Sequence, residues 1–525
     1  MKTTWGSWMV TCLCGTLALS ACSSDDNTGS GGSGATGGAA GATGGAAGTM
    51  GGAAGATGGA AGSAGGAGSA GSGGTPSDGG TTPDAGSTGD AAPCAATDIR
   101  GRLLCIPELA IVTEGASGTT YRRFTLTLDQ LVDHDNPNGP HFLQRLTLLH
   151  RDEGAPVVLA SSGYNITTGS REPTELGNTF ATNVVQVEHR YFTPSIPSPA
   201  DWKYLTIQQS AADYHAITVA LKSIYKGKWV NTGASKGGMT SVYHRRFYPN
   251  DLDATVAYVA PNSFGLDDAR YPEFLRAVGG DSWASCRASL NELQKIVLTR
   301  RAEVEPRMTD SYAALGGPAV ALEHALLEMP FTFWQYQSPT DARLGCAAIP
   351  AADAPIATLY SFFSTVSYLR NFSDSGFESY TPYYYQATHQ LGAPGVEDAH
   401  LVGLLQHRDT YRPSYYIPKG VDVPPWDTEA MVDVQNWVKT EAKTMIFIYG
   451  EFDPWSAGRF EIGTTGDNHL FVAPGGNHGS SLMRLTQADR ATALALLQNW
   501  LGVPPVMPLD STQNAFDDET FRPRL

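Results

Sequence analysis

The 525-residue sequence is poor in basic residues. It contains 35 lysines and arginines against 51 aspartates and glutamates, which gives a formal net charge of −16 at pH 7. Nucleic-acid binding depends largely on the neutralisation of phosphates by lysine and arginine, so this balance argues against a nucleic-acid partner. The same excess of negative charge favours solubility over adsorption to anionic lipid.

Patterns typical of metal sites are also missing. None of the 12 histidines stands four residues from another, and no cysteine pair has the C-x-x-C spacing of a zinc or redox site. His134 lies between Asp133 and Asp135, but the spacing of an EF-hand and its final glutamate are absent. We interpret His134 as a structural or surface residue, and we expect neither a metal nor an organic cofactor.

Long apolar runs are absent beyond a short one at the start of the chain. Residues 1–22 combine Lys2, a mostly apolar core over residues 9–19 and a small-residue cleavage site that ends in Cys22. This pattern resembles the lipobox of bacterial lipoproteins and predicts cleavage before Cys22 and lipidation of its thiol, with a plain secretory signal as the alternative. We therefore expect an exported bacterial protein, anchored at the cell envelope (outer membrane or cell surface) only through the lipid on Cys22, or else secreted.

Residues 23–93 consist almost entirely of Gly, Ala, Ser and Thr, with a seven-residue repeat. Large apolar residues are too rare here to bury a core or a coiled-coil seam, so the sequence predicts a disordered tether. About 70 residues of this composition have a root-mean-square reach on the order of 45–50 Å.

Four cysteines follow the tether, and in an exported protein an even number suggests disulfides. Four cysteines allow three pairings. Proximity in the sequence favours Cys94 with Cys105 and Cys286 with Cys346, and free buried thiols are the alternative.

The most informative motif is the single G-x-S-x-G, formed by residues 233–237. It follows the apolar residues Trp229 and Val230 and precedes a helix-like run. A strand that turns directly into a helix strains the residue at the turn, and glycines two positions on either side leave room for it. Ser235 is thereby predicted to be an exposed nucleophile, and the backbone N–H of Lys236 is placed to stabilise an oxyanion.

A serine nucleophile requires a histidine that accepts its proton and an acid that orients the histidine. The apolar run 445–449 predicts a buried strand, and Asp453 follows it. A second short strand over 469–473 is followed by a glycine-rich loop with His478 and then by a helix capped by Thr486. Ser235, Asp453 and His478 therefore each follow a strand, in the order that strand–turn–helix hydrolases require. Glu451 is the alternative acid, but the Asp-Pro-Trp context favours Asp453.

Helical patterns fill most of the stretch between the strand 254–260 and the strand that begins at residue 445. We expect an α/β-hydrolase fold in which a large, mainly helical cap is inserted after the strand next to the nucleophile and covers the active site. The expected boundaries are 94–262 and 444–525 for the two parts of the α/β-hydrolase domain and 263–443 for the cap.

From about residue 120 to 502 the chain resembles secreted prolyl tri/tetrapeptidyl aminopeptidases of actinobacteria and, more distantly, lysosomal prolylcarboxypeptidase and its dipeptidyl-peptidase relative. The resemblance rests on segments 129–134, 142–145, 187–192, 201–206 and 233–239, on the Asp453 to Trp455 element and on His478. The lysine after the nucleophile, where the lysosomal relatives tend to carry tyrosine, points to the bacterial branch.

The resemblance implies a serine peptidase that releases tri- or tetrapeptides from free N-termini by cleaving after proline. It implies the triad of Ser235, Asp453 and His478, and a pocket for the proline ring lined by Trp455. An indole face suits an apolar ring, although Trp455 is also interpretable as ordinary core. The loop 161–164 is the expected source of the second oxyanion donor, for which we favour the backbone N–H of Tyr164.

Recognition of a free amino terminus requires a carboxylate at a fixed distance from the nucleophile. The candidates near the expected active edge are Glu172, Glu175 and Glu188. Glu188 is equally interpretable as a structural partner of Arg190 or Arg145.

Two other functions use the same sequence features. A carboxylic-ester hydrolase (esterase or lipase) would use the same three residues, since fold does not fix the substrate. A non-catalytic lipoprotein that binds at the cell surface is the third hypothesis, and the complete triad argues against it.

Overall fold

The computed structural model describes residues 94–117, 120–168 and 173–506. The predicted signal segment 1–22 with Cys22, the tether 23–93 and the candidate Glu172 lie outside these ranges. In the described part of the chain, no helix has both the length and the apolar character that a bilayer crossing would require.

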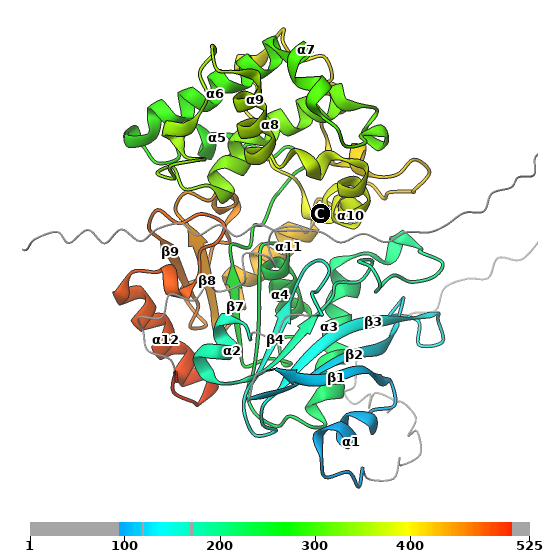
Figure 1. Cartoon of the computed structure of the whole chain (residues 1–525). Coiled ribbons are helices and arrows are strands. Elements are labelled where there is room, and N and C mark those ends of the chain that lie inside the picture. The colour runs from blue at the N-terminus through cyan, green and yellow to red at the C-terminus, as the bar shows by residue number, and fades with distance from the viewer. Residues whose placement is uncertain (1–93, 118–119, 169–172, 507–525) are drawn as a thin grey trace, which may run out of the picture. The chain divides into compact units, whose positions relative to one another are not determined.

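A single twisted sheet forms the centre of the domain (Figure 1). In the described residues it has nine strands in the order β1-β2-β3-β5-β4-β6-β7-β8-β9. The pairs β1–β2, β2–β3 and β3–β5 are antiparallel. From β5 onward, each strand in the order β5-β4-β6-β7-β8-β9 is parallel to its neighbours within that series. The strands are β1 (Leu109–Ser117), β2 (Tyr121–Leu131), β3 (His141–His150), β4 (Val157–Ser161), β5 (Asn183–Val187), β6 (Trp229–Ala234), β7 (Ala254–Tyr258), β8 (Met445–Gly450) and β9 (His469–Ala473).

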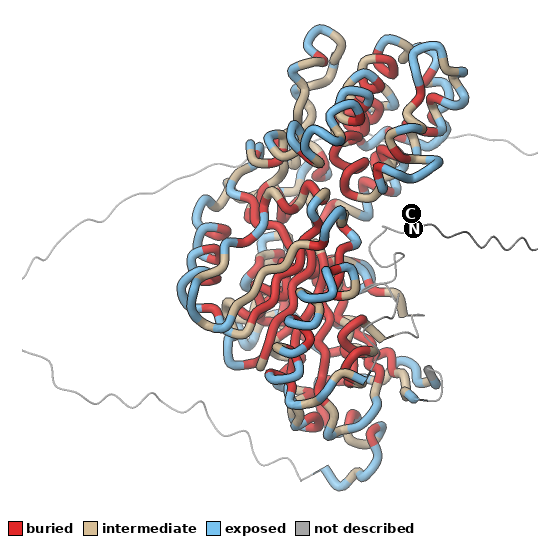
Figure 2. Tube along the Cα trace, turned by 90° about the vertical axis from the view of Figure 1, so that its left-hand side faces the viewer, coloured by how far each residue is buried: buried red, intermediate tan, exposed pale blue. Residues whose placement is uncertain are grey.

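Helices cover both faces of the parallel strands, and β8 shows why its sequence is apolar throughout. Met445, Phe447 and Tyr449 pack in one cluster with α4 (Lys236–Phe247) and α11 (Ala430–Thr440). Ile446 and Ile448 pack in another cluster on α2 (Glu175–Phe180) and α12 (Gln487–Leu501). Because successive side chains of a strand point to opposite faces, a strand covered on both sides buries every side chain and is therefore mostly apolar. Figure 2 shows the buried strands at the centre of the trace.

The remaining helices of the sheet domain follow the sequence signals closely. α1 (Ile99–Leu104) and α3 (Ile207–Lys222) pack on the same core as β2 and β5. At α12, Thr486 accepts a hydrogen bond from the backbone N–H of Asp489, and Gly502 ends the helix in the left-handed conformation. The expected capped helix after His478 is therefore confirmed.

A helical region is inserted between β7 and β8, as the sequence predicts (Figure 1). Its helices form a separate apolar core built around Leu293, Leu326 and Phe363. α11 lies before β8 in the sequence but packs on the sheet, so the part of the insertion with its own core ends before α11. The helices of the inserted core are α5 (Arg270–Ala277), α6 (Ala284–Thr299), α7 (Arg301–Val304), α8 (Pro318–Tyr336), α9 (Ile356–Val366) and α10 (Asp374–Gln386).

Both predicted disulfides are present. Cys94 is bonded to Cys105 at the start of the described chain, and Cys286 on α6 is bonded to Cys346 within the helical insertion. Parallel strands with helices on both faces and a helical insertion after β7 constitute the α/β-hydrolase fold.

Candidate active site

Ser235 occupies the sharp turn between β6 and α4. Its φ of 54° and ψ of −128° lie in a region that non-glycine residues rarely adopt. A Cβ atom on Gly237 would lie 2.2 Å from the carbonyl oxygen of Ser161, and one on Gly233 would lie 2.3 Å from that of Gly237. Other backbone segments approach both positions so closely that only glycine fits, which explains the G-x-S-x-G spacing.

The start of α4 provides a donor beside the serine. Ser235 directly precedes the first residue of α4, Lys236, and the first backbone N–H groups of a helix have no partner within it. Together with the helix dipole, such groups favour a negative charge at this position. Ser235 as a whole is only partly buried, unlike its neighbours in β6 and α4.

Asp453 and His478 meet beyond the ends of β8 and β9. Oδ2 of Asp453 lies 2.7 Å from Nδ1 of His478, and the two side chains are 0% and 2% exposed, respectively. Oδ1 of Asp453 accepts the backbone N–H of Trp455 at 3.1 Å, which fixes the orientation of the carboxylate. A carboxylate bonded at Nδ1 holds the imidazole in the tautomer whose Nε2 accepts a proton.

The other ring nitrogen of His478 remains available. Nε2 is buried and makes no hydrogen bond to Ser235 or to any other described residue. Since β6, β7, β8 and β9 are parallel neighbours, Ser235, Asp453 and His478 all lie at the carboxyl edge of the sheet. Hydrogen bonds between nucleophile and base are commonly long in ligand-free enzymes and shorten when substrate binds.

The loop after β4 packs against the turn that carries Ser235. The backbone N–H of Tyr164, which we expected to be the second oxyanion donor, has another partner. The backbone N–H of Tyr164 donates to Oγ of Ser162 at 3.0 Å, so this group is engaged within its own loop. Gly163 has a φ of +76°, and a Cβ there would lie 2.5 Å from the backbone nitrogen of Gly237. The loop and the start of α4 are therefore in backbone contact.

The Lys236 side chain links the same two segments. Nζ of Lys236 is buried, donates to the carbonyl oxygen of Gly163 at 2.8 Å and lies 5.6 Å and 5.4 Å from the ring centres of Tyr164 and Phe192. Burial holds the pKa of Lys236 well below its usual value. The side chain thus positions the loop, in addition to the expected role of its backbone N–H.

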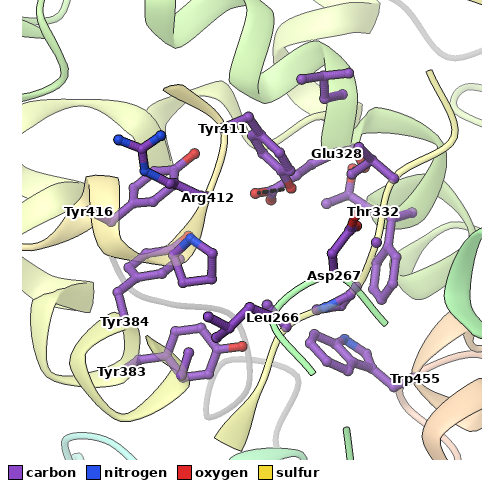
Figure 3. Close-up of a pocket in the computed structure, with 18 of the residues that line it drawn as sticks. Leu266, Asp267, Glu328, Thr332, Tyr383, Tyr384, Tyr411, Arg412, Tyr416 and Trp455 are labelled. Carbon is purple, nitrogen blue, oxygen red and sulfur yellow. Dashed lines mark hydrogen bonds between the residues drawn. The ribbon is translucent and has the colours of Figure 1, made fainter. Parts of the chain in front are cut away.

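A cavity of about 430 Å³ opens between the triad loop and the helical insertion. Figure 3 shows its wall, with Trp455 at one side and Glu328, Thr332 and Tyr411 at another. The wall is mostly apolar and aromatic, with a small number of charged groups, as is usual for sites that bind small ligands or peptide ends.

Trp455 connects the cavity to the candidate triad. Its ring centre lies 6.2 Å from that of His478, and it packs edge-on against Phe331 at 5.0 Å and Tyr271 at 5.7 Å. Its indole Nε1 is buried and has no hydrogen-bond partner among the described residues. The structure therefore places Trp455 on the cavity wall, where the sequence predicted a pocket residue.

Of the carboxylates proposed for amine recognition, Glu175 and Glu188 do not line this cavity. Glu188 is buried and accepts hydrogen bonds from Arg145, from the hydroxyl of Ser195 and from the backbone N–H of Ile166. It thus has the structural role that the sequence left open, with Arg145 and not Arg190 as its partner.

Glu175 is also fully engaged inside the domain. It accepts the hydroxyl of Tyr258 at 2.8 Å and the backbone N–H groups of Leu482 and Met483. These bonds join α2 to the segment that follows His478, so Glu175 supports the site and does not face it. Glu172 lies outside the described residues.

Two carboxylates line the cavity, and sequence reasoning missed both: Asp267, which is exposed, and Glu328 on α8, which is only partly buried. Glu328 lies in a long apolar helical pattern that contains a second acid, Glu323, and nothing in the sequence separates the two. Burial raises the pKa of Glu328 to about 7, although the hydroxyl of Tyr411 donates to it.

His134 has a structural environment. Its Nε2 lies 2.8 Å from Oδ1 of Asp213, and its backbone N–H donates to Gln209. Within residues 94–117, 120–168 and 173–506, no group of three or more His, Cys, Asp or Glu side chains is arranged to hold a metal ion.

A family model and the sequence of a curated relative identify a peptidase family. Residues 91–525 match the family model described as PS-10 peptidase S37. The prolyl tri/tetrapeptidyl aminopeptidase of Streptomyces mobaraensis is 42% identical over 421 residues, which cover 78% of this chain and 86% of that protein. The human thymus-specific serine protease is 27% identical over 36% of this chain and 39% of its own length. Among solved structures, a proline iminopeptidase of Mycobacterium smegmatis matches with 15% identity and a TM-score of 0.33, covering 72% of this chain and 99% of that one.

Proposed function

Because the chain belongs to the S37 family of peptidases, we propose that it is a serine exopeptidase that cleaves after proline and releases tri- or tetrapeptides from free N-termini. The observation that carries the proposal is the buried 2.7 Å contact between Asp453 and His478 at the sheet edge where Ser235 stands at positive φ. The extensive identity with an enzyme named as a prolyl tri/tetrapeptidyl aminopeptidase supports the substrate class.

In the proposed mechanism His478 Nε2 takes the proton of Ser235 as Oγ attacks the carbonyl carbon of proline. Asp453 keeps the imidazole oriented and stabilises the imidazolium. The backbone N–H of Lys236, at the start of α4, donates to the oxyanion of the tetrahedral intermediate. His478 then gives its proton to the leaving amine, and water resolves the acyl-enzyme by the same steps in reverse.

Proline specificity is assigned to the aromatic wall beside the triad. The ring of Trp455, supported by Phe331 and Tyr271, offers an apolar face to the pyrrolidine ring. Burying about 80–100 Å² of proline surface there would contribute roughly 2–2.5 kcal/mol.

The test is a substrate profile. The purified enzyme is given proline anilides of one to five residues with free N-termini, together with a short-chain acyl ester, and kcat/KM is measured for each. We expect a maximum at three or four residues and loss of turnover in Ser235→Ala by several orders of magnitude. A strong preference for the ester would favour the esterase hypothesis, and failure of the folded protein to react with a fluorophosphonate would favour a non-catalytic binding protein.

We also propose export and lipid anchoring at Cys22. The support is the lipobox-like pattern of residues 1–22, together with two disulfides, which persist in oxidising compartments. In the producing cell, Cys22→Ala is expected to abolish incorporation of labelled fatty acid and to release the protein from the envelope fraction. Labelling that persists in this variant would contradict the proposal.

A further inference from the structure

α8 carries two glutamates with opposite environments. Glu323 is buried, pairs with Arg301 at 2.9 Å and accepts the backbone N–H groups of Gln406 and His407. Glu328 lies five positions further along the same helix and accepts one hydrogen bond, from the hydroxyl of Tyr411 at 3.0 Å. Among the described residues, no lysine, arginine or histidine forms an ion pair with Glu328.

The two arginines of the cavity wall, Arg408 and Arg412, bond to groups other than Glu328. Arg408 forms its ion pair with Asp398, and Nη1 of Arg412 donates to the carbonyl oxygen of Asp409 at 2.8 Å. A carboxylate in a mostly apolar wall without a cation is costly, which is why burial raises the pKa of Glu328 to about 7. Such a group is stabilised when a ligand brings a positive charge.

The surroundings of Glu328 suit an ammonium group. Tyr383, Tyr384, Tyr411 and Tyr416 line the same cavity, and in Figure 3 they are seen around the space that the Glu328 carboxylate faces. Aromatic faces attract a desolvated cation, and a carboxylate beside them supplies the opposite charge. The same cavity ends at Trp455, whose buried Nε1 has no described partner and is suited to donate to a peptide carbonyl.

We propose that Glu328 binds the α-ammonium group of the substrate, within the cage formed by Tyr383, Tyr384, Tyr411 and Tyr416. This inference rests on the proposed function, since it assigns the part of the site that recognises a free N-terminus.

The position of Glu328 on α8 also accounts for the length of the released peptide. Gln335 lies on the same helix, and its carbonyl oxygen accepts the backbone N–H of His478 at 2.9 Å. Gln335 lies seven positions after Glu328, which corresponds to about 10 Å along the helix axis. An extended peptide covers about 3.3–3.6 Å per residue, so about three residues reach from the triad to the ammonium site.

The main experiment compares two substrates that differ only at the N-terminus, Ala-Ala-Pro anilide and its N-acetyl form. For the wild type we expect higher kcat/KM on the free amine. In Glu328→Gln we expect kcat/KM for the free amine to fall about 10- to 100-fold, with little change for the acetylated substrate. Glu328→Asp, which keeps the charge, should retain part of the preference.

Two further variants serve as controls. Glu292→Gln removes an exposed carboxylate of the same helical insertion, paired only with Lys295, and should leave the preference unchanged. Asp267→Asn removes the exposed carboxylate of the cavity wall. If Asp267→Asn and not Glu328→Gln abolishes the preference, the assignment to Glu328 is overturned. Glu328→Gln should melt no lower than the wild type, because it removes a charge that has no cation.

A binding measurement separates this inference from the proposed function. The affinities of the peptides Ala-Ala-Pro and N-acetyl-Ala-Ala-Pro for the wild type and for Glu328→Gln are measured by calorimetry, without turnover. A preference for the free amine that disappears in Glu328→Gln supports the inference even if the enzyme proves to cleave another bond. Turnover after proline with equal affinity for both peptides, or a preference that survives in Glu328→Gln, overturns it.

Discussion

The backbone N–H of His478 donates to the carbonyl oxygen of Gln335 at 2.9 Å, so the loop that carries the imidazole is bonded to the last turn of α8. The last carbonyl groups of a helix lack partners within it, and they place partial negative charge at its end. The end of α8 therefore holds the loop that carries the catalytic histidine.

Asp453→Asn tests the assignment of the acid. Asparagine keeps the shape of the side chain but holds the imidazole in the wrong tautomer, and we expect kcat to fall about 10³- to 10⁴-fold, as in the serine-protease template. The measurement is steady-state turnover of a proline-terminated anilide. The matched control is Glu451→Gln, because Glu451 accepts the backbone N–H of Gly475 near the surface and should leave kcat within about twofold. The reverse pattern would make Glu451 the acid.

Gly237→Ala tests the strained turn. The added Cβ would lie 2.2 Å from the carbonyl oxygen of Ser161, so the backbone must shift. We expect a loss of roughly 2–4 kcal/mol in the free energy of unfolding and a large loss of turnover. Gly115→Ala is the control, since its nearest neighbour atom would lie at 3.8 Å. Urea denaturation and the rate on a proline anilide measure both effects, and a fully active Gly237→Ala would argue against the turn as the nucleophile site.

The preference for a free N-terminus should depend on pH. Because burial raises the pKa of Glu328 to about 7, its ionised form prevails only above that pH. A peptide α-amino group has a pKa of about 7.7–8.0 and is protonated only below it. The preference should therefore rise from pH 5 to about pH 7 and fall above about pH 8.

The other groups that line the cavity do not change the direction of this pH dependence. Burial raises the pKa values of the cavity tyrosines, so they stay neutral in this range. Of the arginines in the wall, Arg408 pairs with Asp398, and Arg412 donates to the carbonyl oxygen of Asp409. The ratio of kcat/KM for free and acetylated Ala-Ala-Pro anilide is the appropriate readout, because protonation of the triad affects both substrates equally. A ratio that does not vary with pH in the wild type would contradict the assignment.

Removal of the disulfide between Cys286 and Cys346 should loosen the helical insertion selectively. Its sequence separation is 60 residues, and the loop-entropy model assigns about 4 kcal/mol to a bridge of that span. We expect Cys286→Ser/Cys346→Ser to unfold at lower denaturant concentration and to raise KM more than it lowers kcat. Cys94→Ser/Cys105→Ser, at the far edge of the domain, should leave KM unchanged. Equal KM values for both double variants would show that the integrity of the helical insertion does not affect substrate binding.

The sequence identified those site residues whose function is indicated by the residues next to them in the chain. Ser235 was found because the glycines at 233 and 237 have a geometric reason, and Asp453 and His478 were placed because each follows a short apolar strand. The helical insertion was predicted from helical patterns between two buried strands, and its position after β7 is confirmed.

The residues that local sequence could not identify depend on distant partners. Glu323 and Glu328 look alike on one helix, and only distant segments distinguish them. Arg301 and the backbone of residues 406–407 bind Glu323, whereas the hydroxyl of Tyr411 binds Glu328. Glu175 and Glu188 lie close to the active edge as the sequence suggests, but their side chains turn inward to distant hydrogen-bond partners. The assignment of α11 to the sheet likewise rests on contacts with β8 and α4 that its own amphipathic pattern does not reveal.

The cavity that α8 lines has a consequence for the choice of substrates. A substrate whose α-ammonium group must reach Glu328 cannot extend beyond that residue. Internal segments of a folded protein therefore cannot enter the site as substrates. An enzyme built in this way digests oligopeptides and frayed chain ends while sparing the intact proteins that surround it.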